Sequence, residues 1–292
     1  MRRSAYAIAL PLGLAACSLA GPLRAGEVGE RDFPATLTID DPAVEDEASL
    51  PILLHGPAGR GAGRANDFDF EIDKIVADGI EIAVNDTYAA PEPAGQRRGY
   101  GWQDFTTSVK YELIEDEPSE IITSIGLVRA WGGTGAVSAG GDPAGSTTPM
   151  VYFGKGMGDL STDWLRPIAL TGTLGYQISD DGRGDPRNLG IGFSVQYSMP
   201  YLSEVVGRKL PELVDGLNPL IELSYTTPTG RAGAASTEGT AAPGVIYTND
   251  VIQFGLEALI PLTRATGHGV GIAAQFHVYF DEIEPALATR LF

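Results

Sequence analysis

The stretch NLGIGFSVQYSM, residues 188–199, decides the fold class because polar and apolar residues alternate along it without exception. The apolar members are Leu189, Ile191, Phe193, Val195, Tyr197 and Met199. The residues between them are Asn, Gly, Ser or Gln. Successive side chains of a β-strand point to opposite faces, so this pattern predicts a strand with one apolar and one polar face.

The same alternation recurs along the chain. It is clear at 108–113, 252–260 and 270–280, and further strands are expected near 68–76, 79–88, 120–131, 149–156, 165–178, 218–227 and 243–248. This gives about eleven strands, several of them longer than the roughly five or six residues usual in soluble sheets. A strand that spans a bilayer needs about 9–11 residues. Residues 49–54 and 245–248 are the doubtful segments, and 201–216 predicts a short helix or helical loop instead.

The two faces of these strands differ in a way that is typical of a membrane barrel. The polar face consists mostly of small residues, and aromatic residues gather near the strand ends: Trp102, Trp131, Tyr197, Tyr201, Tyr279 and Phe280. Lipid outside, a polar lumen and aromatic girdles produce this distribution. Bacterial single-chain barrels have an even number of strands. The sequence therefore predicts an all-β fold, a closed antiparallel transmembrane β-barrel of 10–12 strands with twelve favoured; a soluble periplasmic sandwich or lipocalin-like barrel is the alternative.

The N-terminus predicts export. Arg2 and Arg3 precede an uncharged, mostly apolar run at 5–16, and a small residue at Ala25 follows Pro22, so residues 1–25 are interpreted as a signal peptide. The stretch LAAC at 14–17 is a competing lipoprotein signal, with Cys17 as the lipidated residue. Both interpretations direct the chain out of the cytoplasm, and the barrel predicts the outer membrane of a Gram-negative cell.

Composition excludes some classes of protein. The chain has 38 acidic and 20 basic residues, a formal charge of −18, so nucleic acid is not an expected partner. One cysteine excludes a disulfide framework and a thiolate zinc site. Residues 26–65 are acidic and lack the ligand spacing of a calcium loop, so they are interpreted as an irregular, solvated segment. The predicted division is a signal peptide at 1–25, this segment at 26–65 and the barrel at 66–292.

Several short motifs carry a family resemblance. They are DEASLP at 46–51, WGGTG at 131–135, FGKGMGDL at 153–160, LRP at 165–167 and IPL at 260–262. From about residue 40 to its end, the chain resembles uncharacterised proteobacterial outer-membrane barrels akin to the family named for the meta-pathway of phenol degradation. The resemblance implies an outer-membrane location and passage of small organic compounds, and it supplies no catalytic residue. In one departure, 281–291 separates the terminal Phe292 from the last strong strand.

Polar and ionisable residues within the strands are the candidate functional residues. The predicted lumen-lining residues are Lys110, Glu112, Arg129, Gln196, Glu222, Glu257, Gln275 and His277. In a closed barrel such groups either set selectivity or pair and fill the interior. Because the joint at 261–267 is short, Glu257, Gln275 and His277 are expected to form one lumen-facing patch on two paired strands.

Three functions follow from this reasoning. The first is a narrow channel or transporter for small solutes, organic compounds included. The second is a structural or interaction barrel with a blocked lumen and its acidic segment in the periplasm, and the third is an outer-membrane enzyme that modifies lipid. A metal site is not expected, since His55, His268 and His277 are scattered. Enzyme activity, catalytic residues and cofactors are not expected either, because His277 shares the polar face with Gln275 and Tyr279 and so points into the lumen. The expected partners are outer-membrane lipid and a small-molecule solute; the oligomeric state is not assigned.

Overall fold

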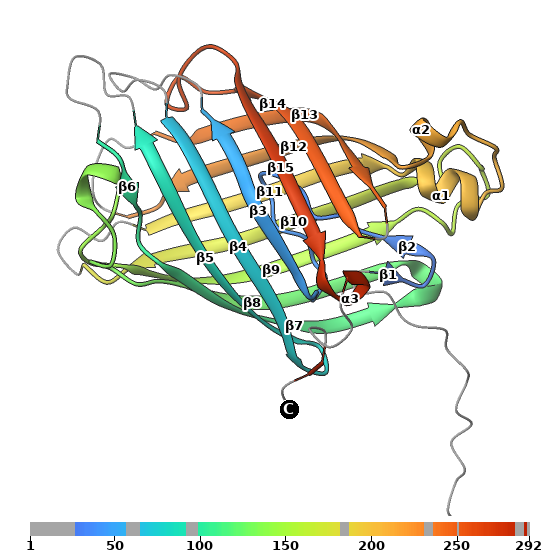
Figure 1. Cartoon of the computed structure of the whole chain (residues 1–292), viewed down its shortest axis with the longest axis horizontal. Coiled ribbons are helices and arrows are strands. Elements are labelled where there is room, and N and C mark those ends of the chain that lie inside the picture. Colours follow the sequence, from blue (N-terminus) through green and yellow to red (C-terminus); the bar gives the residue numbers. More distant parts are fainter. Residues whose placement is uncertain are drawn as a thin grey trace, which may run out of the picture.

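A computed structural model describes residues 27–56, 65–91, 99–181, 187–230, 236–249, 251–283 and 289–290. Within these ranges, twelve long strands form one closed barrel (Figure 1). They are β3 (Glu47–His55), β4 (Ala65–Ala77), β5 (Ile80–Pro91), β7 (Thr106–Asp116), β8 (Ile121–Ala130), β9 (Ser146–Gly156), β10 (Ile168–Ser179), β11 (Arg187–Tyr197), β12 (Leu217–Pro228), β13 (Glu238–Thr248), β14 (Ile252–Pro261) and β15 (Gly271–Tyr279).

Every neighbouring pair of these strands is antiparallel, and the sheet closes where β3 pairs with both β15 and β4. At the closure, Glu47 of β3 is opposite Tyr279 of β15 and opposite Asp73 of β4. A closed sheet leaves no row of unpaired backbone groups, which lipid could not hydrogen-bond. The predicted fold class and the favoured number of strands are confirmed.

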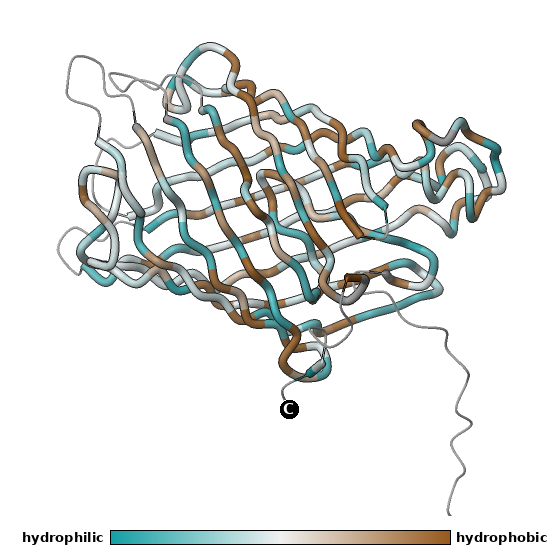
Figure 2. Tube along the Cα trace, in the orientation of Figure 1, coloured by the Kyte–Doolittle hydropathy of each residue, from teal (hydrophilic) through white to brown (hydrophobic). Residues whose placement is uncertain are grey.

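The alternation predicted from sequence separates the two faces of the wall. Along β11, Ile191 is 47% exposed, whereas Ser194 and Gln196 are almost fully buried. Leu174 and Leu256 are likewise exposed on neighbouring parts of the outer wall, and apolar residues recur along the barrel strands in Figure 2. The large side chains therefore face outward and the small polar ones face the lumen, as an outer-membrane barrel requires.

The two ends of the barrel differ. We call the end where β3 begins and β15 finishes the terminal end. There, residues 78–79 join β4 to β5, and the turn η1 (Glu117–Ser119) with Glu120 joins β7 to β8. The helices α1 (Met199–Glu204), α2 (Glu212–Asp215) and α3 (Phe280–Ile283) also lie there (Figure 1). The opposite end, the loop end, carries the connection 131–145 with η2 (Val137–Ala139), and the short strand β6 (Gly101–Trp102). None of the described helices is long and apolar enough to cross a membrane.

Most of residues 28–46 lies inside the barrel, and this differs from the sequence-based expectation. The short strands β1 (Glu27–Val28) and β2 (Arg31–Asp32) lie at the terminal end (Figure 1), and the residues after them are buried up to Glu47 apart from Asp40 and a half-buried Thr38. We call residues 28–46 the plug. The prediction of a solvated acidic segment is wrong because the segment also carries apolar side chains such as Phe33, Leu37 and Ile39, which are buried in the lumen. The barrel wall also starts at Glu47, not at residue 66.

The plug is packed against the inner wall through two apolar clusters. Val28, Phe33 and Ala43 contact Ile122 and Ala169 near the terminal end. Deeper in the lumen, Leu37 belongs to a cluster with wall residues: Leu220, Ala242, Ile246, Leu259 and Ala273. Burial of these side chains stabilises the inserted plug by roughly 1.5–3 kcal/mol for each large one. Residues 1–25, Cys17 and Phe292 lie outside the described residues.

Candidate functional site

The tip of the plug is fixed to a buried glutamate. The backbone N–H of Thr38 donates to Oε2 of Glu222, 2.9 Å away, and the Thr38 hydroxyl donates to the same oxygen. Glu222, on β12, is fully buried. A carboxylate in such a position needs hydrogen-bond donors to offset its lost hydration, and the plug supplies two of them.

A lysine joins the plug to the wall on the other side of the lumen. Nζ of Lys110, on β7, lies 3.3 Å from Oδ1 of Asp40 and 3.4 Å from Oε1 of Glu81 on β5. Glu81 also accepts a hydrogen bond of 2.8 Å from the backbone N–H of Glu45. Lys110 therefore pairs with one acid of the plug and one acid of the wall, and Glu81 also holds the plug directly through its hydrogen bond to Glu45.

Uncharged polar groups form a third set of contacts along β14 and β15. The amide of Gln253 donates to the backbone carbonyl of Ala35 in the plug and to Oε1 of Gln275, 3.1 Å away. Gln275 in turn donates to the hydroxyl of Ser49, which lies 3.0 Å from Nδ1 of His277. This chain of hydrogen bonds crosses the seam between β15 and β3.

The entry of the plug is held at the terminal end. Nε of Arg31 lies 3.1 Å from Oε2 of Glu120, and its guanidinium stacks over the Tyr201 ring of α1 at 3.7 Å. The Tyr201 hydroxyl donates to Oε1 of Glu120 at 2.7 Å. Arg31 also donates to the backbone carbonyls of Pro167 and Arg166. These contacts fasten the start of the plug to three turns of the barrel.

Burial also changes the acidity of the plug. Desolvation raises the pKa of Asp41, although Lys110 opposes that shift. Desolvation, with the neighbouring Glu47, raises the pKa of Glu45 well above its usual range. Both carboxyl groups therefore favour the protonated form more than exposed carboxyl groups do.

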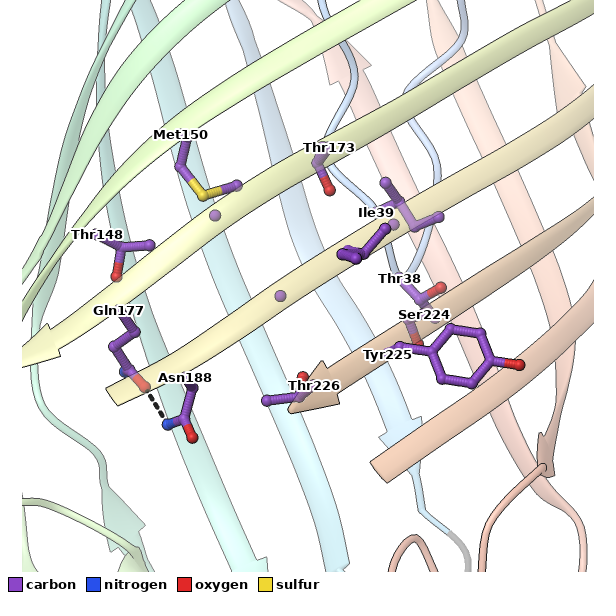
Figure 3. A pocket seen from close by; sticks show the side chains of 14 residues that line it. Thr38, Ile39, Thr148, Met150, Thr173, Gln177, Asn188, Ser224, Tyr225 and Thr226 are labelled. Atoms are coloured by element: carbon purple, nitrogen blue, oxygen red, sulfur yellow. Dashed lines mark hydrogen bonds between the residues drawn. The ribbon is translucent and has the colours of Figure 1, made fainter. Parts of the chain in front are cut away.

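A cavity of about 300 Å³, the vestibule, lies between the plug tip and the wall of β9 to β12. Thr38 and Ile39 line it on the plug side, facing strand residues that include Met150, Gln177 and Asn188 (Figure 3). Nδ2 of Asn188 donates to Oε1 of Gln177 at 2.7 Å. Its lining residues are Thr, Gly, Ser, Asn, Gln, Ile, Met and Tyr, with no charged side chain among those described. The vestibule thus offers neutral hydrogen-bonding groups to a solute.

The structure brings most of the residues selected from sequence to the interior. Lys110, Gln196, Glu222, Glu257, Gln275 and His277 are buried on the inner face. Glu112 shares the inner face of β7 with Lys110 but lies half-buried beside Gly79, at the terminal end.

Arg129 was predicted to line the lumen, and that prediction is wrong. On β8 it shares a face with the exposed Ile125 and Leu127, so it lies on the outer wall. Its guanidinium pairs with Asp180 and lies 5.4 Å from the Trp131 ring. This position near the loop end suits an interfacial anchor, since long basic side chains place their charge at the membrane surface.

The plug is the functional element that sequence reasoning missed. Its signal was present: Phe33, Ala35, Leu37 and Ile39 alternate with polar residues or proline. This is the same period of two that revealed the wall strands. The many acids around it concealed the pattern.

No family model matches the sequence, and no curated protein matches it. Solved structures match the fold. An outer-membrane channel of the COG4313 group from Pseudomonas putida F1 has a TM-score of 0.58 at 10% identity, over 85% of this chain and 99% of that one. The NanC porin has a TM-score of 0.51 at 8% identity, over 80% of this chain and 98% of that one. The chain has the fold of porin-like outer-membrane barrels; the finer resemblance, to the meta-pathway family, stays a prediction.

The expectation that the chain is not an enzyme needs correction. LpxR from Salmonella typhimurium, an outer-membrane enzyme, also matches, with a TM-score of 0.45 at 10% identity over 80% of this chain and all of that one. A fold does not determine function, so the architecture alone gives no ground for excluding catalysis. A likeness this distant assigns no activity to the chain.

Proposed function

We propose that this chain is an outer-membrane channel for small, uncharged polar solutes, and that its plug moves before a solute passes. The observation that carries the proposal is the position of the vestibule. It has the volume of a small ligand site, lies toward the loop end and stops at Thr38 and Ile39 of the plug tip. Neutral donors and acceptors on its wall suit a solute that carries hydroxyl or amide groups.

The plug contacts also favour a second function, a barrel that stays blocked. Arg31, Lys110 and Glu222 hold the plug at its entry, middle and tip. A segment fixed at three places is expected to move slowly. Transport must therefore be measured directly, with the plug both free and locked.

The test is swelling of vesicles that contain the folded full-length chain, in a small uncharged sugar. A Cβ at position 192 would lie 2.8 Å from Cγ2 and 3.2 Å from Cγ1 of Ile39. The pair Ile39→Cys and Gly192→Cys is therefore close enough to form a disulfide between plug and wall. Cys17 is replaced by serine in this background, so that no other thiol competes.

We expect swelling with the parent chain, at least tenfold slower swelling with the oxidised double variant, and recovery on reduction. The single variant Ile39→Cys serves as the control and should stay permeable under oxidation, because it lacks the second thiol. If vesicles with the parent chain do not swell in any small sugar, the channel proposal fails and the blocked barrel is favoured. If the oxidised double variant stays permeable, solutes pass without movement of the plug.

A further inference from the structure

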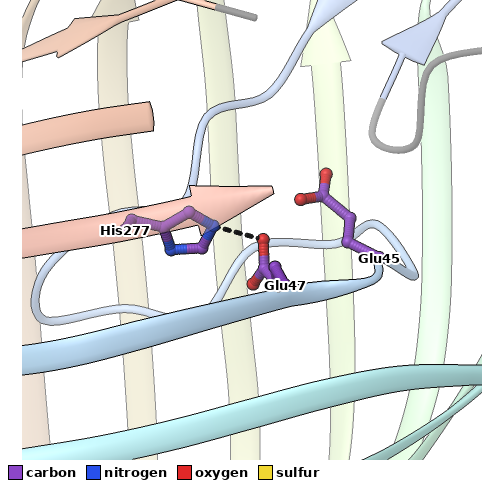
Figure 4. Close-up of side chains that lie close together, drawn as sticks. All are labelled: Glu45, Glu47 and His277. Atoms are coloured by element: carbon purple, nitrogen blue, oxygen red, sulfur yellow. Dashed lines mark ion pairs between the residues drawn. The ribbon is translucent and has the colours of Figure 1, made fainter. Parts of the chain in front are cut away.

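Three buried side chains converge where the plug joins the wall. Glu45 is near the end of the plug, Glu47 is the first residue of β3, and His277 is on β15 (Figure 4). One ligand atom from each lies within 4.8 Å of the other two. Nε2 of His277 is 2.7 Å from Oε2 of Glu47.

The converging atoms lack hydrogen bonds. Oε2 of Glu45, Oε2 of Glu47 and Nε2 of His277 are buried. The last two form an ion pair with each other, but none of the three makes a well-aligned hydrogen bond. Buried polar atoms in proteins are nearly always paired, so such a group calls for an explanation. His277 is fully buried, and its other ring nitrogen lies 3.0 Å from the Ser49 hydroxyl. That contact holds the ring so that Nε2 is directed at the two carboxyl groups.

The surroundings carry excess negative charge. Asp41, Asp73 and Glu81 are also buried in this part of the lumen. The two nearby lysines are already engaged, Lys110 with Asp40 and Glu81, and Lys74 with Asp46. A bound cation would offset the charge of Glu45 and Glu47, which neither lysine contacts among the described ion pairs.

We propose that Glu45, Glu47 and His277 form a binding site for a divalent first-row transition metal ion, with Zn²⁺ as the best fit. An imidazole nitrogen together with carboxylate oxygens suits zinc, whereas calcium and magnesium prefer oxygen ligands alone. Zinc bonds of about 2.0–2.2 Å require only a small separation of the Glu47 and His277 atoms. Ser49 is then the outer partner that orients the histidine.

This site would fasten the plug. Glu45 belongs to the plug, whereas Glu47 and His277 belong to the two wall strands that close the barrel. One ion would therefore tie the end of the plug to the seam of the barrel. A metal site was not expected from the sequence because its three histidines are far apart, but two glutamates complete the set around one of them. The site does not depend on the channel proposal, since binding is measured without transport.

The test is zinc binding to the folded full-length chain in detergent after treatment with a chelator. Competition with a chromophoric chelator should give one Zn²⁺ ion per chain, bound at least 100-fold more tightly than Ca²⁺ or Mg²⁺. Glu45→Gln and His277→Gln should each weaken zinc binding at least tenfold. The matched control is Asp73→Asn, which removes a neighbouring buried acid outside the three ligands and should change the affinity less than threefold.

Two further measurements distinguish a loss of zinc binding from a failure to fold. Glu45 is in the plug, so Glu45→Gln leaves the barrel wall unchanged, and the shift of folded barrels on unheated gels checks each variant. X-ray absorption of the zinc-loaded parent chain needs no variant and should show oxygen and nitrogen ligands with imidazole scattering. Absence of stoichiometric binding, equal weakening by Asp73→Asn, or a spectrum without imidazole would overturn the proposal.

Discussion

The guanidinium of Arg31 meets the carboxylate of Glu120 at the terminal end of the barrel, with Nε 3.1 Å from Oε2 and both side chains buried. Arg31 belongs to the plug, and Glu120 follows the turn between β7 and β8. The barrel wall therefore holds the plug through a charged hydrogen bond at the point where the plug enters the lumen. Tyr201 of α1 completes this contact by donating to the same carboxylate.

Breaking this pair should release the entry of the plug. Removal of one partner of a buried ion pair leaves the other charge unpaired, at a cost of about 3–5 kcal/mol. We expect Arg31→Met and Glu120→Gln to make the plug more than tenfold more sensitive to protease, while the barrel stays intact on unheated gels. Arg208→Met, which breaks the exposed pair with Asp163, is the control and should leave the rate unchanged. Equal rates in all variants would show that Arg31 does not anchor the plug.

Filling the vestibule should slow solute passage. Gly190 is on the inner face of β11 and lines the cavity, and a Cβ placed there meets no atom closer than 3.9 Å. Gly190→Trp therefore has room for its Cβ, its ring is expected to occupy the cavity, and sugar-driven vesicle swelling should fall at least fivefold. Leu189→Trp introduces the same side chain at the neighbouring position, which faces outward, and should leave swelling unchanged. Equal effects of the two substitutions would reject the vestibule as the solute route.

The face assignment of β15 can be tested with lipid-soluble quenchers. Gln275 is 4% exposed and joined to Ser49 and Gln253, whereas Phe276 packs on the exposed Phe254 with ring centroids 4.9 Å apart. A fluorophore attached to a cysteine at position 276 should be quenched by brominated lipid. One at position 275 should be quenched at least threefold less. The reverse pattern would place Glu257 and His277 in the bilayer and reject the lumen assignment.

Sequence alone predicts the wall of this barrel well because each wall strand has lipid on one side. The apolar face of 188–199 reports that environment residue by residue, and β11 spans Arg187–Tyr197. Prediction is weaker where a strand begins or ends. Arg129 lies on the outer face near the loop end, where its long side chain reaches the membrane interface. An arginine is accepted there as well as in a polar lumen, so the residue type alone does not show which face it occupies.

The interior is harder to predict because its contacts join residues far apart in the chain. Most of the barrel strands lie between Glu45 and His277 in the sequence, and the pairing of β15 with β3 brings the two residues together in space. Lys110 could be recognised as an inward residue from alternation. Its partner Asp40 could not, since the alternation at 33–39 indicates an extended segment but not that this segment enters the lumen. The plug therefore emerges from the structure rather than from the pattern.

Stability should depend on pH through Glu45. Burial and the nearby Glu47 raise the pKa of Glu45 well above its unfolded value of about 4.5. The folded chain therefore holds a proton that the unfolded chain has lost, and the free energy of unfolding falls as pH rises. The stabilisation is complete below about pH 4.5 and disappears as pH rises through the folded-state pKa, with a limiting slope of about 1.4 kcal/mol per pH unit for one proton.

The measurement is urea unfolding of the folded chain in the presence of a chelator, between pH 5 and pH 8 in steps. Glu45→Gln cannot titrate, so the difference in unfolding free energy between parent and variant isolates Glu45 from the other buried acids of the lumen. As pH rises, we expect the unfolding free energy of the parent chain to fall relative to that of Glu45→Gln. Glu30→Gln removes an exposed acid near the start of the plug and should run parallel to the parent. A Glu45→Gln profile parallel to the parent would mean that Glu45 is ionised in the folded protein and that burial does not raise its pKa.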